Sequence, residues 1–151
     1  MKLHFGRILA AAVLCLAASA SVLAQFSSGC KLIVHVDGFR DDKGKLGVTL
    51  FNQPNGWPEK NDKSFRHGPF PINGKTGTGI FTDLPPGPYA VAVIHDENEN
   101  KKLDRNFFNI PTEGFGFANN PKVTLSAPHY SAAIVHVACP VTETTVHLIY
   151  K

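Results

Sequence analysis

The most constraining feature of this sequence is the alternation of apolar and polar side chains at every second position. A period of two is the signature of a β-strand with one buried face. No long segment shows the 3.6-residue period of an amphipathic helix. The run at 89–94 is apolar on both faces, which predicts a central strand. The other strands that we expect are 32–37, 46–51, 77–84, 130–138 and 141–150, with a further short one at 121–125.

The turns between these strands predict how the sheets are built. Residues 40–44 form a polar turn that would join 32–37 and 46–51 as a β-hairpin. A second hairpin is expected around Cys139-Pro140. About seven short strands with Gly and Pro between them favour an all-β, antiparallel β-sandwich of the immunoglobulin-like or transthyretin-like kind. A small closed barrel is the alternative. Two long loops, 52–74 and 95–120, interrupt this plan.

The first 24 residues are interpreted as a secretory signal peptide. Lys2 and Arg7 give a positive start, an apolar run covers 8–17, and small residues lead to a cleavage site after Ala24. A retained membrane anchor is the alternative, but no other stretch is apolar enough to span a bilayer. We therefore expect a single domain at 25–151, periplasmic or secreted, without a transmembrane anchor.

Charge and cysteine content narrow the class of protein further. The chain carries 15 Lys+Arg against 12 Asp+Glu, a net charge of +3, so no strongly basic face is expected and nucleic acid is not an expected partner. Two cysteines, Cys30 and Cys139, remain after signal removal. An even pair in an exported chain predicts a disulfide, and two separate thiols are the alternative.

A short acidic stretch at 95–104 carries the chemistry that the sequence predicts. Oxygen-bearing side chains stand at positions 1, 3, 5 and 9 of a calcium-loop pattern, with a backbone carbonyl at position 7. Calcium takes six to eight oxygen ligands, which alternate residues of a tight loop can supply. The candidate metal ligands are Asp96, Asn98, Asn100, the carbonyl of Lys102, and Asp104.

The calcium pattern is incomplete, and a metal-free loop is the alternative. Lys101 stands where an EF-hand has glycine, and Phe107 stands where it has a bidentate glutamate. Glu113 could supply a later carboxylate. A site of this kind predicts weak binding, at about 10⁻⁴–10⁻³ M. Asp and Asn also fold loops by hydrogen bonds to the backbone, without an ion.

Several blocks of the chain resemble the exported bacterial family called domain of unknown function 2141. The specific ones are His-Asp-Glu-Asn at 95–98 and Pro-Thr-Glu-Gly-Phe-Gly-Phe at 111–117. The blocks at 38–51 and 84–93 also fit, and the resemblance covers nearly the whole mature chain. It implies a secreted or periplasmic β-sandwich with no established activity, so it assigns no catalytic residue. Glu99 and Lys101 depart from the family, which has glycine at both positions.

Aromatic and histidine residues suggest two further functions. Phe107, Phe108, Phe115 and Phe117 are expected to fold back and cap one end of the sandwich, and an exposed patch is the alternative. With Trp57, such a patch would make the protein a carbohydrate- or peptide-binding module. His95 and Asp96 could instead serve a hydrolase, but adjacent strand residues point to opposite faces and no nucleophile motif is present.

We therefore expect an exported, non-enzymatic β-sandwich that acts as a binding or structural module in the cell envelope. Calcium held by the 95–104 stretch is the expected cofactor, and it would make that excursion rigid. The expected partner is an unidentified cell-envelope ligand or protein, and the expected state is a monomer.

Overall fold

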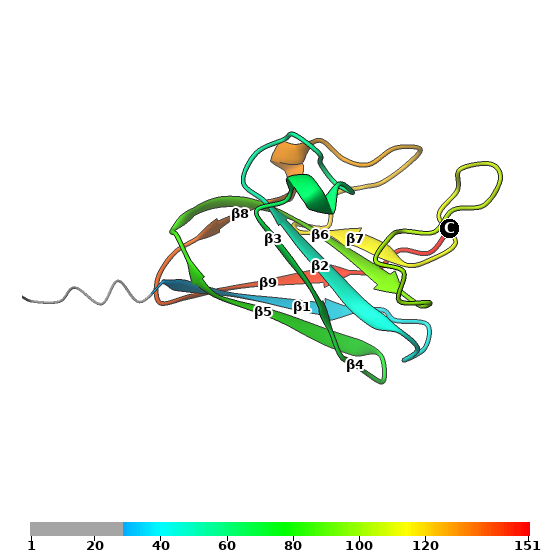
Figure 1. Ribbon diagram of the computed structural model, residues 1–151, viewed down its shortest axis with the longest axis horizontal. Helices are drawn as coiled ribbons and strands as arrows, with labels where there is room; N and C mark the ends of the chain where they lie inside the picture. The colour runs from blue at the N-terminus through cyan, green and yellow to red at the C-terminus, as the bar shows by residue number, and fades with distance from the viewer. Residues whose placement is uncertain (1–28) are drawn as a thin grey trace, which may run out of the picture.

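Two β-sheets face each other as a sandwich in the computed structural model, which describes residues 29–151 (Figure 1). The predicted signal peptide at 1–24 lies outside these residues. The first sheet has the order β4-β5-β1-β9, with β1 (Cys30–Asp37), β4 (Ile72–Asn73), β5 (Thr76–Leu84) and β9 (Val141–His147). The second has the order β3-β2-β6-β7, with β8 also paired to β6. Its strands are β2 (Lys45–Phe51), β3 (Arg66–Phe70), β6 (Gly87–Asp96), β7 (Phe115–Phe117) and β8 (Ile134–Val137).

The predicted all-β sandwich is confirmed, with nine strands, of which β4 and β7 are very short. All strand pairs are antiparallel except β1 with β9, which is parallel. The described residues form no α-helix, only the two 3₁₀ turns η1 (Asn61–Lys63) and η2 (Tyr130–Ala133). Over the same residues, no helix has the length and apolar character needed to cross a bilayer.

The core lies between the sheets and takes every second residue of the long strands. In β1, Leu32, Val34 and Val36 are buried and their neighbours are partly exposed, as the period of two requires. Strand β6 is buried on both faces, which confirms that it is central. Val91 and Val93 face the core between the sheets, whereas the opposite face of β6 lies under a second apolar cluster. That cluster comprises Phe51, Ala90, Ala92, Phe115, Phe117 and Ala133, with Trp57 and Tyr130 packed against it.

Both predicted hairpins are wrong. Strands β1 and β2 lie in different sheets, because β1 pairs with β5 and β9 while β2 pairs with β3 and β6. Strands β8 and β9 also belong to different sheets. Alternation fixes which side chains face the core, but two strands that cover the same core from opposite sides alternate just as a hairpin does. The turns at 38–44 and 138–140 therefore cross from one sheet to the other.

Other segment boundaries also differ from the prediction. The long loop expected at 52–74 contains β3, β4 and η1, and the one at 95–120 contains β7. Strand β3 is not predicted from the sequence, because a proline such as Pro69 argues against a strand. It forms here because β3 is an edge strand, where proline is tolerated. The short strand expected at 121–125 is absent, since these residues form no ladder and Leu125 is fully exposed.

The predicted disulfide between Cys30 and Cys139 is confirmed, with 4.4 Å between the two Cα atoms. It joins the start of β1 to the connection between β8 and β9. In Figure 1 this end of the sandwich lies opposite the loops that follow β6. The covalent link therefore holds the two sheets together at one end and leaves the other end to noncovalent contacts.

Two consecutive asparagines at the end of β7 hold the second sheet to the outer edge of β9. Both have positive φ, 64° at Asn119 and 47° at Asn120. The Asn119 amide donates to the carbonyls of Ala132 and Ile134. The Asn120 side chain accepts from the His147 N–H at 2.8 Å and donates to the Thr145 carbonyl at 3.0 Å. Asn120 thus satisfies two backbone groups of β9 that face away from β1.

Candidate functional site

The candidate site begins where β6 ends, at His95 and Asp96, and continues into residues 96–104, which we name the Asx loop. Both side chains are buried and they have different partners. His95 Nε2 donates to the Lys43 carbonyl at 2.8 Å, and Nδ1 pairs with the Tyr150 hydroxyl at 2.8 Å. Asp96 accepts from the loop backbone instead. His95 and Asp96 are therefore not arranged as a general base with its orienting acid.

His95 belongs to a cluster of polar groups that are linked by hydrogen bonds and one ion pair. The Tyr150 hydroxyl also accepts from the Arg40 N–H at 3.2 Å, and burial raises the pKa of Tyr150. The Arg40 guanidinium pairs with Glu97 at 2.5 Å. The hydrogen bond to Glu97 raises the pKa of Arg40. This cluster ties the end of β6 to the 38–44 turn and to the C-terminal segment.

Asp96 shapes the loop by accepting hydrogen bonds from its backbone. One carboxylate oxygen accepts from the Asn100 N–H at 3.0 Å and the other from the Lys101 N–H at 2.8 Å. Glu99 and Lys101 both adopt left-handed backbone conformations, with φ of 59° and 65°. These are the two positions where the family resemblance predicts glycine, which takes such φ values without strain. The loop therefore makes the turn despite its side chains at these positions.

Three of the predicted ligand side chains come together at the other end of the loop. The Asn98 amide donates to one oxygen of Asp104 at 2.6 Å, and the Asn100 amide donates to the other at 2.8 Å. The Asn98 and Asn100 carbonyl oxygens accept from backbone N–H groups at positions 100 and 102. Of the two other predicted ligands, Asp96 lies at the base of the same loop. The Lys102 carbonyl accepts no hydrogen bond from the described part of the chain. The loop is thus internally hydrogen-bonded without any ion.

The sequence suggests Glu113 only as a possible extra calcium ligand, and its contacts with the loop backbone are not predicted. The residue as a whole is 4% exposed. One oxygen accepts from the Glu97 N–H at 2.9 Å and the other from the Asp104 N–H at 3.0 Å. It therefore joins both ends of the Asx loop rather than adding a ligand beside Asp104. Across residues 29–151, no three His, Cys, Asp or Glu side chains form a group that could hold a metal ion.

The four clustered phenylalanines behave in two different ways. Phe115 and Phe117, on β7, are buried and cap the outer face of β6, as predicted. Phe107 and Phe108 are 97% and 77% exposed, so the expectation that they also fold back is wrong. They stand at the tip of residues 105–111, a second loop that we name the aromatic loop. A pair of backbone contacts between Arg105 and Pro111 closes its base.

Glycine explains why β7 can lie so close to the C-terminal segment. A Cβ atom at Gly114 would lie 2.5 Å from the Tyr150 ring, and one at Gly116 would lie 2.7 Å from Val146. Both distances are far inside van der Waals contact, so only glycine fits. The close approach lets Phe115 pair with Ile149 of the C-terminal segment.

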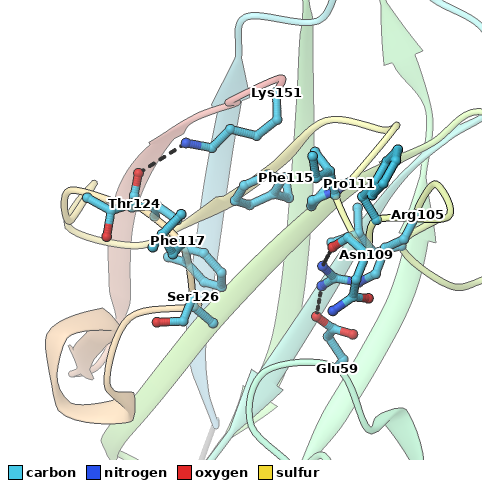
Figure 2. Close-up of a pocket in the computed structure, with 15 residues that line it drawn as sticks. Glu59, Arg105, Asn109, Pro111, Phe115, Phe117, Thr124, Ser126 and Lys151 are labelled. Atoms are coloured by element: carbon cyan, nitrogen blue, oxygen red, sulfur yellow. Dashed lines mark hydrogen bonds and ion pairs between the residues drawn. The ribbon is translucent and has the colours of Figure 1, made fainter.

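Between the aromatic loop and residues 121–128 lies a hollow of about 710 Å³ (Figure 2). Phe115 and Phe117 line its floor, and Phe108 and Leu125 stand at its sides. Arg105, paired with Glu59, lies at one rim. At the other, Lys151 Nζ donates to the Val123 carbonyl at 3.2 Å. The hollow is thus a mainly apolar recess with charged rims, a common form of ligand site.

Trp57 does not contribute to an exposed patch. Its ring packs against Phe51, Phe117 and Tyr130, with centroid separations of 5.5–5.9 Å. Its indole N–H donates to the Pro128 carbonyl at 2.9 Å. Trp57 is therefore a packing residue of the second apolar cluster, beneath the hollow rather than in it.

Comparison with known proteins finds one family. Residues 34–145 match the model described as "Uncharacterized protein conserved in bacteria (DUF2141)". The match includes the Asx loop, the aromatic loop and Glu113. No curated protein matches the chain, and no solved structure does.

Proposed function

This chain belongs to the DUF2141 family of bacterial proteins, and from that premise we propose that it is an exported, non-enzymatic binding module of the cell envelope. The hollow beside the aromatic loop would receive an apolar group of its ligand. The observation that carries the proposal is the exposure of Phe107 and Phe108 next to an apolar recess of about 710 Å³. Exposed apolar patches rimmed by polar groups commonly mark binding surfaces.

Export and the absence of catalysis have separate support. The Cys30–Cys139 disulfide fits an oxidising compartment, and the charged, apolar and small-residue order of 1–24 fits a signal peptide. His95 and Asp96, the pair considered for a hydrolase, are buried and hydrogen-bonded to separate partners. Neither side chain is presented to the hollow.

A soluble apolar dye tests the binding role directly. We expect N-phenyl-1-naphthylamine to bind the mature protein saturably at one site, and Phe108→Ser to weaken binding about tenfold, because Phe108 lines the hollow. Phe107→Ser is the matched control, since Phe107 is a neighbouring exposed phenylalanine that does not line it. Fluorescence titration measures both. No saturable binding, or equal binding by Phe108→Ser, contradicts the proposal.

A second candidate function is calcium binding by the Asx loop. The convergence of Asn98 and Asn100 on Asp104 favours it, because the three side chains already share one small region. The carbonyl oxygens of Asn98 and Asn100 each accept one N–H and retain a second lone pair. Calcium would then make the Asx loop more rigid and stabilise the folded state by mass action.

Isothermal titration tests the calcium site. We expect heat of binding with a dissociation constant of about 10⁻⁴–10⁻³ M. Asp104→Asn should weaken binding at least tenfold, because it removes a carboxylate charge at constant shape. Asp62→Asn, which removes an exposed acid outside the loop, should bind as the wild type does. The calcium site is wrong if millimolar calcium gives no heat, or if Asp104→Asn binds unchanged.

A further inference from the structure

We propose that residues 121–128, which we name the flap, open and close over the floor of the hollow and so control the entry of its ligand. This inference rests on the binding role proposed above and specifies how that role is regulated. Phe115 and Phe117 form the floor of the hollow, yet they are only 5% and 6% exposed. A ligand that meets the closed form therefore finds almost none of the aromatic surface on which it would pack, and the flap must move to uncover it.

The backbone of the flap donates no hydrogen bonds. None of the N–H groups of residues 122–127 has an acceptor in the part of the chain that the structure describes, and the prolines at positions 121 and 128 have no N–H to donate. The flap belongs to no strand, and the side chains of residues 124–127 are exposed. A segment with few buried contacts and a solvated backbone opens locally, without unfolding of the domain.

Both ends of the flap are fixed to the sandwich. Before it, Asn119 is hydrogen-bonded to the start of β8, and Asn120 is hydrogen-bonded to β9. At the other end, the Pro128 carbonyl accepts from the indole N–H of Trp57 at 2.9 Å. The flap can therefore lift as a loop that is held at both ends, and it returns to the same closed position.

Val123 holds the middle of the flap closed. Its side chain is partly buried against the second apolar cluster, and its carbonyl accepts from Lys151 Nζ at 3.2 Å (Figure 2). Within residues 29–151, Lys151 makes no ion pair and donates no other side-chain hydrogen bond. One partly buried side chain and one hydrogen bond stabilise the closed form only modestly, so opening is within reach of thermal motion.

Opening of the flap joins two spaces that lie against it. Besides the hollow of about 710 Å³, a smaller recess of about 350 Å³ is lined by residues 120–123 together with His147 and Ile149. Phe117 and Val123 line both spaces. When Val123 lifts, the hollow and the recess become one cavity above the Phe117 ring, and neither sheet has to move for a ligand to reach it.

Trypsin tests the flap without any ligand. We expect trypsin to cleave the folded mature protein after Lys122, an exposed residue of the flap. Lys151→Met should be cleaved there about fivefold faster, because it removes the hydrogen bond to Val123 and cleavage follows the population of the open form. Lys31→Met is the matched control, since Lys31 lies on β1 beside the disulfide. Mass spectrometry of the fragments over time measures the rates.

Stopped-flow fluorescence tests whether the flap controls entry. With N-phenyl-1-naphthylamine, Lys151→Met should raise the association and dissociation rate constants by about fivefold each, because the hydrogen bond to Val123 is lost from the free and the bound protein alike. The dissociation constant should then change little. Loss of a direct contact between Lys151 and the dye would instead raise the dissociation rate alone and weaken binding, so the two rate constants distinguish a gate from a lining residue.

Two results would overturn the inference. One is cleavage of Lys151→Met after Lys122 at the rate of Lys31→Met, and the other is an unchanged rate of dye association in Lys151→Met. Faster cleavage of Lys151→Met, together with no dye binding by any variant, overturns the binding role of the hollow but supports the opening of the flap.

Discussion

Replacing both cysteines of the crosslink, Cys30→Ala together with Cys139→Ala, is expected to lower the free energy of unfolding by about 4–5 kcal/mol. The bond closes a loop across a sequence separation of 109 residues, so its loss releases a large part of the denatured chain. It also joins β1 of one sheet to the segment that leaves β8 of the other. Urea denaturation of the double variant beside the wild type measures the change.

Reduction of the wild-type protein is the control for packing. Cys30 is fully buried, so its replacement by alanine also removes contacts in the core. Reduction breaks the covalent link but keeps both sulfur atoms in place, and it should account for most of the loss. A reduced protein that unfolds at the same urea concentration as the oxidised one would show that the crosslink is not what stabilises this end.

Removing the Glu113 carboxylate, as Glu113→Ala, should lower the free energy of unfolding by about 2–4 kcal/mol. The carboxylate is buried and accepts from the N–H groups of Glu97 and Asp104. Hydrogen bonds to a charged acceptor contribute about 1.5–3 kcal/mol each, and an unpaired buried donor adds a desolvation cost. Because the two donors lie at opposite ends of the Asx loop, that loop should loosen first. Hydrogen exchange of residues 97–104 and denaturant unfolding measure the two effects.

The isosteric variant Glu113→Gln separates the hydrogen bonds from the volume of the side chain. Glutamine keeps one carbonyl acceptor and places an NH₂ group where the second oxygen was. It should therefore retain one of the two loop contacts and cost less than alanine does. The role of Glu113 as the residue that closes the loop is wrong if Glu113→Ala unfolds within about 0.5 kcal/mol of the wild type.

The fold could be predicted to the level of the sandwich because burial follows the period of two. Alternation located β1, β2, β5 and β9, and the fully apolar run located β6 at the centre. Alternation says nothing about the partner of a strand. It therefore predicts two hairpins at places where the chain in fact crosses from one sheet to the other. Strand β7 was missed because its Phe-Gly-Phe is too short to show a period.

The candidate site was predicted in composition but not in its hydrogen bonding. The sequence located the loop and the residues that gather in it, and oxygen spacing alone cannot distinguish a cation from backbone N–H groups as their partner. Glu113 is a lone acid, and only the tertiary fold places it beneath the loop. The Asn119-Asn120 pair did carry a usable signal, since asparagine is the side chain that best tolerates the left-handed conformation both residues adopt. Phe107 and Phe108 are exposed because they lie at the tip of a loop whose base is closed by the pairing of Arg105 with Pro111. The pattern of apolar residues in the sequence does not predict this pairing.

The contact of Asn120 with β9 has a consequence for self-association. An open sheet edge is a template on which a second polypeptide can extend the ladder and begin a fibril. The Asn120 side chain occupies the Thr145 carbonyl and the His147 N–H, the groups that an incoming strand would need. A foreign strand that pairs at this end of β9 must first displace an intramolecular amide, so a single asparagine blocks extension of the ladder there.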